Sequence, residues 1–121
     1  MEKVHKTHRD LDLWKNSIQL VKYIYDLSSS FPSNELYGLT SQLRRAAVSV
    51  PSNIAEGSAR HSKKEFVQFL YIASGSMSEI ETQLIISNEL NYISVTELEK
   101  LINQLNELRA QLYGLIKYLN K

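Results

Sequence analysis

Apolar side chains recur at steps of three and four residues along almost the whole chain, and this spacing most limits what the chain can fold into. Leu11, Trp14, Ile18, Val21 and Tyr25 follow it in the first segment. Such spacing places side chains on one face of an α-helix, whereas a strand would need alternation at every second residue. Only two prolines and four glycines interrupt the 121 residues. The pattern therefore predicts an all-α protein.

Breaks in the apolar pattern divide the chain into four predicted helices. The first ends near Ser28–Ser30, because the residue before Pro32 is steered away from helical backbone. The second starts at Ser33-Asn34-Glu35 and continues through Pro51 as one kinked helix. Gly57 and Ser58 are its expected stop signals.

Capping signals mark the two remaining helices. Ser62 followed by Glu65 is a capping-box signature, and the third helix then keeps its register to about Asn91. Ser94 or Thr96 can cap the fourth. Four long helices with short links predict an up-down-up-down four-helix bundle. We expect residues 1–8 to form a flexible N-terminus and residues 9–121 to form one domain.

Composition limits the class of protein. The chain has no cysteine, so it can hold neither a disulfide nor a thiolate zinc site. Its first thirty residues lack an apolar signal-peptide core, and no apolar run approaches the roughly 18 residues of a membrane span. We therefore expect a cytoplasmic protein without a membrane partner.

Charge is distributed unevenly, although the net charge is only +1. Residues 1–64 hold ten Lys or Arg against six Asp or Glu, and residues 65–121 hold four against seven. Such asymmetry can mark a basic face for nucleic acid. It can equally reflect charge pairing between antiparallel helices or between subunits, and both interpretations stay open.

The sequence offers little for catalysis. His5 and His8 fall in the expected flexible segment, and His61 precedes the third helix. None belongs to a zinc-hydrolase helix or to a Glu-x-x-His pair, and the chain has no nucleophile elbow or phosphate loop. We expect a protein that is not an enzyme and needs no cofactor or metal.

An unusual number of small residues lies in the middle of the chain. Two interpretations fit: tight packing of the second helix on the third, or a polar pocket with Arg45 and Glu56 as buried charges. In the packing interpretation Ser52, Asn53 and Ser74 satisfy backbone groups freed by Pro51. The stretch is marked by Pro51, Ser52, Asn53, Glu56, Gly57, Ser74 and Gly75.

Basic residues suggest a site for phosphate. A dense group between residues 60 and 64 comes just before a helix, whose first N–H groups also favour anions. A solvated, charged turn is the alternative. The candidate nucleic-acid-binding residues are Arg44, Arg45, Arg60, His61, Lys63 and Lys64, with Lys3, Lys6, Arg9 and Lys15 as further basic residues.

Aromatic residues exceed what one small core would bury, and aromatic residues are enriched at interfaces. The chain has one tryptophan and seven tyrosines. They predict a homo-oligomer, unless the tyrosines line the surface with their hydroxyls in water. These residues are Trp14, Tyr23, Tyr25, Tyr37, Tyr71, Tyr92, Tyr113 and Tyr118.

The segment from Gln42 to Gly57, QLRRAAVSVPSNIAEG, closely resembles the signature of the 23S rRNA intervening-sequence protein family. The segment from Phe66 to Ser76 and the opening Asp10-Leu11 with Trp14 are also similar to that family. The resemblance spans roughly residues 9 to 119. It implies a four-helix bundle that assembles into a homo-oligomeric ring, with five subunits expected.

The same resemblance extends to the accessory protein of diversity-generating retroelements, a basic pentamer that binds nucleic acid and a reverse transcriptase. Our chain departs from that protein because it is nearly neutral. The first hypothesis is a homo-oligomer that binds RNA or DNA, or a nucleic-acid-processing protein. The alternative is a protein-interaction or scaffold module without nucleic-acid affinity.

Overall fold

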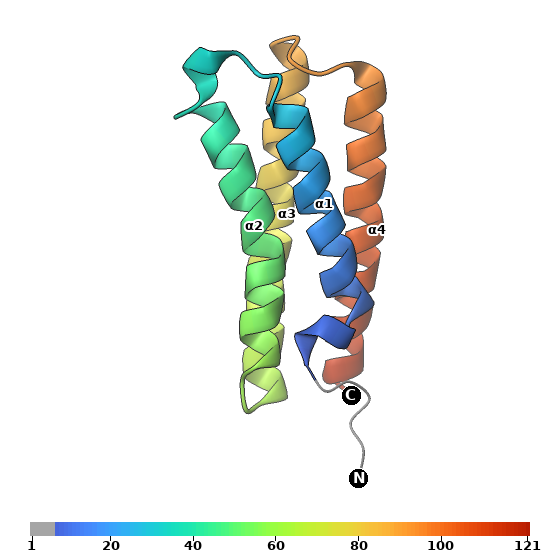
Figure 1. Cartoon of the computed structure of the whole chain (residues 1–121). Coiled ribbons are helices and arrows are strands. Elements are labelled where there is room, and N and C mark those ends of the chain that lie inside the picture. Colours follow the sequence, from blue (N-terminus) through green and yellow to red (C-terminus); the bar gives the residue numbers. More distant parts are fainter. Residues whose placement is uncertain (1–6) are drawn as a thin grey trace.

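Four long helices make up nearly all of the part that the computed structural model describes, residues 7–121 (Figure 1). No strand occurs in that range, which confirms the all-α prediction. Two short 3-10 turns precede the first and second helices. The elements are η1 His8–Asp10, α1 Asp12–Ser28, η2 Ser33–Glu35, α2 Leu39–Ser58, α3 Lys63–Glu89 and α4 Val95–Leu119.

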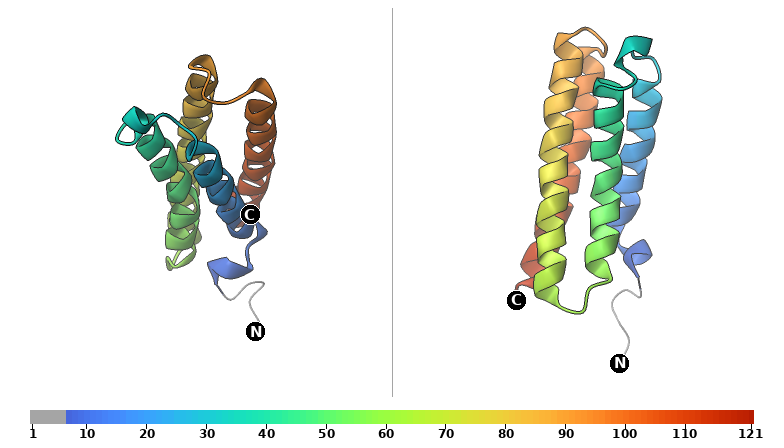
Figure 2. Two further views of the ribbon diagram at one scale, coloured as in Figure 1. Left: turned by 45° about the horizontal axis from the view of Figure 1, so that its top comes forward. Right: turned by 90° about the vertical axis from the view of Figure 1, so that its left-hand side faces the viewer.

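The connections lie alternately at the two ends of the molecule. Figure 1 shows the α1–α2 and α3–α4 connections at one end, and the α2–α3 turn at the other. The described start of α1 and the C-terminus lie at the same end as the α2–α3 turn. In the right-hand view of Figure 2, α2 and α3 stand in front, with α1 behind α2 and α4 behind α3.

One apolar core runs between the four helices. Leu20, Val50, Met77 and Leu105 come from the four different helices, and each is fully buried. The core members on α4 continue as Leu101, Leu108, Leu112 and Ile116, at the three- and four-residue steps that the sequence showed. Burial of these faces is the main source of stability in helices of this length.

Side-chain caps start the third and fourth helices. The Ser62 hydroxyl accepts a hydrogen bond from the Glu65 backbone N–H at 3.1 Å. At α4 the box is complete, because Ser94 accepts from the Glu97 N–H while the Glu97 carboxylate accepts from the Ser94 N–H. Both predicted caps are therefore confirmed, and Ser94 rather than Thr96 caps the fourth helix.

The start of the second helix differs from the expected position. Residues Ser33–Glu35 form a separate 3-10 turn, and α2 begins only at Leu39. Gly38 lies between them with non-helical backbone, at φ −114° and ψ −113°. Beyond that point α2 continues through Pro51 to Ser58, so the predictions of a continuous helix and of its end are confirmed.

A hydrogen bond joins the two connections at one end of the bundle. The Tyr92 hydroxyl donates to the Glu35 carboxylate at 2.8 Å, across 57 residues of sequence. The Tyr92 ring also packs against Phe31, with ring centroids 5.4 Å apart. The second Glu35 oxygen accepts the Leu39 backbone N–H at the start of α2. Glu35 therefore ties the first residues of α2 to the α3–α4 turn.

This hydrogen bond predicts a pH dependence of stability. The hydrogen bond that the Tyr92 hydroxyl donates to Glu35, partial burial and the negative charge of Glu35 all raise the pKa of Tyr92 above its ordinary value of 10.0. A raised pKa means that the contribution is complete below pH 10 and is lost as the pH rises through the folded-state value. Tyr92→Phe should therefore lose less stability than the wild type between about pH 8 and about pH 11. Urea unfolding at both pH values measures this, and equal losses would contradict it.

Candidate nucleic-acid interface

The turn between α2 and α3 carries the densest group of basic residues in the sequence. Ser62 caps α3 by accepting the backbone N–H of the third helical residue, Glu65. The residues around this helix N-terminus are exposed. The side chains of His61, Lys63 and Lys64 are exposed there. Backbone donors and basic side chains thus occur together at one place.

Arg60 is held in position by its neighbours. Its guanidinium lies over the Phe69 ring, 4.7 Å from the centroid, and one of its nitrogens is 3.8 Å from a Glu56 carboxylate oxygen. The side chains of Arg60 and Glu56 are 42% and 54% exposed, so the ion pair is solvated and weak. Arg60 therefore keeps one side open to solvent while its stem is oriented by α3.

Lys63 and Lys64 occupy the first turn of α3, where the helix dipole is positive. Cations at this position oppose the dipole, and Glu65 is the only acidic residue of that turn. A bound anion would remove the conflict, since it would meet both the N–H groups and the ammonium groups. The arrangement therefore suits a phosphate.

The fold brings further basic residues to the same end of the bundle. Lys117 lies in the last turn of α4, and Lys121 follows it. The sequence interpretation missed both, although an alternating course of the helices would have placed them beside the α2–α3 turn. We call this group the basic end; its described members are Arg9, Lys15, Arg60, His61, Lys63, Lys64, Lys117 and Lys121. Lys3 and Lys6 lie outside the described residues.

Arg44 and Arg45, two of the six candidate nucleic-acid-binding residues, do not belong to this group. They lie in the first half of α2, and roughly 20 Å of helix separates Arg44 from the end at Ser58. Arg44 instead holds the end of α1. Its Nε donates to the Ser28 hydroxyl at 2.8 Å, a terminal nitrogen donates to the Tyr25 carbonyl, and the guanidinium covers the Tyr25 ring.

The small residues in the middle of the chain have separate places in the fold. Gly57 is buried against α3, and a Cβ there would lie 2.7 Å from the Phe69 Cβ. Pro51 is buried, and Asn53 donates to the Ser49 carbonyl at 2.8 Å. Ser74 hydrogen-bonds the Tyr113 hydroxyl of α4 at 2.7 Å. Neither Asn53 nor Ser74 thus bonds the Ala47 carbonyl that Pro51 leaves free.

The other small-residue positions predicted to pack between α2 and α3 are exposed, so the packing prediction is wrong for them. Ser52 and Gly75 both face outward, and a Cβ on Gly75 would meet no atom within 4 Å. Glu56 and Arg45 are exposed as well, so the alternative of a polar pocket with buried charges is also wrong. Two other serines of the small-residue stretch do link α2 and α3, because the Ser49 hydroxyl donates a hydrogen bond to the Ser76 hydroxyl at 2.6 Å.

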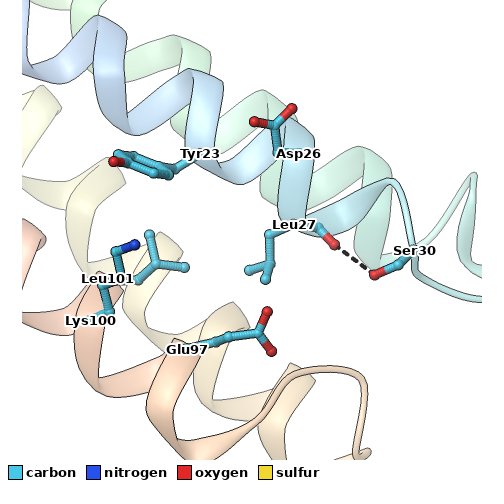
Figure 3. Close-up of a pocket in the computed structure, with 7 residues that line it drawn as sticks. All are labelled: Tyr23, Asp26, Leu27, Ser30, Glu97, Lys100 and Leu101. Atoms are coloured by element: carbon cyan, nitrogen blue, oxygen red, sulfur yellow. Dashed lines mark hydrogen bonds between the residues drawn. The ribbon is translucent and has the colours of Figure 1, made fainter.

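A hollow of about 290 Å³ lies between α1 and α4, at the end opposite the basic end (Figure 3). Leu27 and Leu101 form its apolar part, and the Lys100 ammonium lies 5.1 Å from the centre of the Tyr23 ring. Asp26 and Glu97 place carboxylates on either side (Figure 3). With two carboxylates against one ammonium group, this hollow does not suit a phosphate.

Two further observations limit what the described part can do. Within residues 7–121 no three His, Asp or Glu side chains come together as a metal-binding group. Across the same range, none of the helices is both long and apolar enough to pass through a membrane.

Comparison with known proteins identifies a family and a similar solved structure. The crystal structure of a protein of unknown function from the S23 ribosomal protein family of Bacteroides thetaiotaomicron VPI-5482 is 25% identical. Its TM-score is 0.78, and the match covers 87% of our chain and 98% of that one. No curated protein matches the chain. The model of the 23S rRNA-intervening sequence protein family matches residues 9–114. The resemblance seen in the sequence is thus confirmed, and the chain belongs to the 23S rRNA-intervening sequence protein family.

Proposed function

We propose that this chain is a non-enzymatic, homo-oligomeric four-helix bundle that binds RNA through its basic end. The observation that carries the proposal is that basic residues from three separate parts of the chain lie at the same end of the bundle as the exposed N-terminus of α3. Phosphate contacts supply most of the sequence-independent affinity of nucleic-acid-binding proteins. The same basic residues would also bind the phosphates of DNA. A nucleic-acid-processing protein is the other partner that this proposal includes.

The alternation of the connections between the two ends supports an up-down-up-down course of the helices. This course explains why the turn after α2 and the last residues of α4 share one end. A cytoplasmic location fits the family and a partner such as RNA.

Self-assembly is the second part of the proposal, with a pentameric ring as the expected form. Six of the seven tyrosines are between 42% and 93% exposed, so their rings are available to a partner surface, where aromatic residues are enriched. Assembly would repeat the basic end around one rim, and several weak phosphate sites that act together bind far more tightly than one. A local group of charges can thus serve a chain whose net charge is only +1.

Charge reversal at the turn tests the RNA site. We expect Arg60→Glu, Lys63→Glu and Lys64→Glu together to abolish binding to single-stranded and structured RNA, because they replace phosphate-neutralising charges by charges that repel phosphate. Each lost phosphate contact should also reduce the magnitude of the slope of log K against log salt by about 0.7 to 0.9. Fluorescence anisotropy at about 50 and about 200 mM salt measures both affinity and slope.

A matched pair controls for net charge. Lys63→Glu with Lys64→Glu should weaken binding strongly, whereas Lys22→Glu with Lys100→Glu, exposed residues toward the opposite end, should not. Both pairs change the net charge equally. If RNA affinity survives the triple reversal, or falls equally in both pairs, the proposed site is wrong.

The near-neutral net charge favours one alternative, a protein-interaction module without nucleic-acid affinity. It predicts no RNA binding by the wild type even at the lower salt. A pull-down with the purified protein would then recover proteins whose capture is unchanged by nuclease treatment.

A further inference from the structure

Two partly apolar surfaces of opposite charge flank the end of the bundle that lies away from the basic end. The first, the α1–α2 face, is a hollow of about 580 Å³ lined by Tyr25, Leu36, Tyr37, Arg44, Arg45 and Val48. Tyr37 is 93% exposed, and Leu36 is 51% exposed. Arg45 is exposed and forms no ion pair with any described residue. The face therefore combines uncovered apolar area with positive charge.

The second surface, the α3–α4 face, is a hollow of about 480 Å³ lined by Glu81, Ile85, Leu98, Glu99, Ile102 and Asn103. Ile85 is 43% exposed, and Val95, one helical turn before Glu99, is 58% exposed. Glu81 pairs with Arg109 at 2.6 Å. Glu99 is exposed and has no ion pair within the described residues. This face combines uncovered apolar area with negative charge.

The two faces lie on opposite sides of the bundle. In the right-hand view of Figure 2, α3 and α4 form one side, and α2 and α1 form the other. Both hollows lie toward the end with the α1–α2 and α3–α4 connections, so they are at a similar height along the helices. A neighbouring copy in the same orientation would bring one kind of face against the other.

We infer that the α1–α2 face of one copy of this chain docks on the α3–α4 face of the next, head to tail. The occupant is a second copy because each face supplies the charge that the other lacks. Pairing of either face with itself would place Arg45 against Arg45, or Glu99 against Glu99, and like charges across an interface are unfavourable. The inference rests on the self-assembly in the proposed function and assigns the surfaces that make it.

Head-to-tail contacts close into a ring when the rotation between neighbours divides a full turn. Because the two faces lie at a similar height, neighbouring copies can share one orientation, and a rotation about an axis along the helices at each contact would bend the row of copies into a ring. Every basic end then lies on the same rim of the ring. The geometry of the contact thus links assembly to the proposed RNA site.

Paired charge reversals test the contact. Arg45→Glu and Glu99→Arg should each weaken self-association by about tenfold or more, because each places like charges across every contact. Light scattering should then show the mass of each variant falling toward that of the 13.9 kDa chain at concentrations where the wild type is assembled. The double variant exchanges the two charges and should regain the wild-type mass.

Two controls separate the possible failures. Lys22→Glu and Glu107→Arg make the same charge changes away from Arg45 and Glu99 and should leave the mass unchanged, while circular dichroism checks that every variant is helical. If the wild type is assembled and both single reversals leave its mass intact, or if the double variant stays dissociated, this inference is wrong and self-assembly stands. A monomeric wild type overturns both. RNA anisotropy on the same samples reports on the basic end independently.

Discussion

Ile80→Ala should lower the free energy of unfolding by about 2 to 5 kcal/mol. Ile80 lies in the middle of α3 and is fully buried in the shared core. The substitution removes the transfer free energy of three carbon atoms, and it leaves a cavity that helices on all sides can fill only in part. Urea unfolding at a fixed protein concentration measures the loss, because the proposed self-assembly would make the stability depend on concentration.

Ile86→Ala is the matched control in the same helix. Ile86 is 43% exposed, so truncation leaves no closed cavity, and alanine is the better helix former. We expect a loss of about 1 kcal/mol or less. Equal losses at the two positions would mean that α3 does not turn the predicted face toward the core.

Gly57→Ala should destabilise the protein by about 1 to 3 kcal/mol, although alanine normally favours a helix. The added Cβ would lie 2.7 Å from the Phe69 Cβ, 2.9 Å from the Phe66 Cδ1 and 3.2 Å from the Phe66 carbonyl oxygen. The Phe69 Cβ is attached directly to the α3 backbone, so it cannot move aside without a shift of the helix. The end of α2 would have to separate from α3.

The opposite sign is expected at the two open glycines. Gly75 in α3 and Gly114 in α4 are exposed, and a Cβ on either would meet nothing within 4 Å. Gly75→Ala and Gly114→Ala should each raise the free energy of unfolding by about 0.5 to 1 kcal/mol. Chemical denaturation of the three variants side by side measures the difference. A stabilised Gly57→Ala would show that α2 and α3 are farther apart than described.

The helices could be predicted from the sequence because their apolar period is a local property. Which of the small residues contact a neighbouring helix is not a local property. Gly57 and Gly75 both stand among small residues, yet one faces α3 closely and the other faces outward. The start of α2 was misplaced for a related reason. Ser33–Glu35 has a capping composition, but its Glu35 carboxylate is held by Tyr92 and by the Leu39 N–H, and only the tertiary fold brings Tyr92 there.

The candidate site was predictable only in part. The dense turn at Arg60–Lys64 is visible as a run of charges, and its exposure follows from its place between two helices. The sequence does not distinguish Arg44 from the basic residues of that turn, but in the fold its guanidinium donates hydrogen bonds to the Ser28 hydroxyl and the Tyr25 carbonyl at the end of α1. Lys117 and Lys121 are more than fifty residues from the turn in sequence, so only the course of the helices reveals that they share its end.

The contact between His8 and Trp14 gives this molecule a built-in optical reporter. Trp14 is the single tryptophan of the chain, it is partly buried in the first turn of α1, and the His8 ring meets it edge-on with centroids 5.0 Å apart. Indole emission from this protein therefore comes from one known position, at the end of the bundle that carries the basic residues. Changes in its colour or intensity report on that end alone, without a label and without a contribution from any other indole.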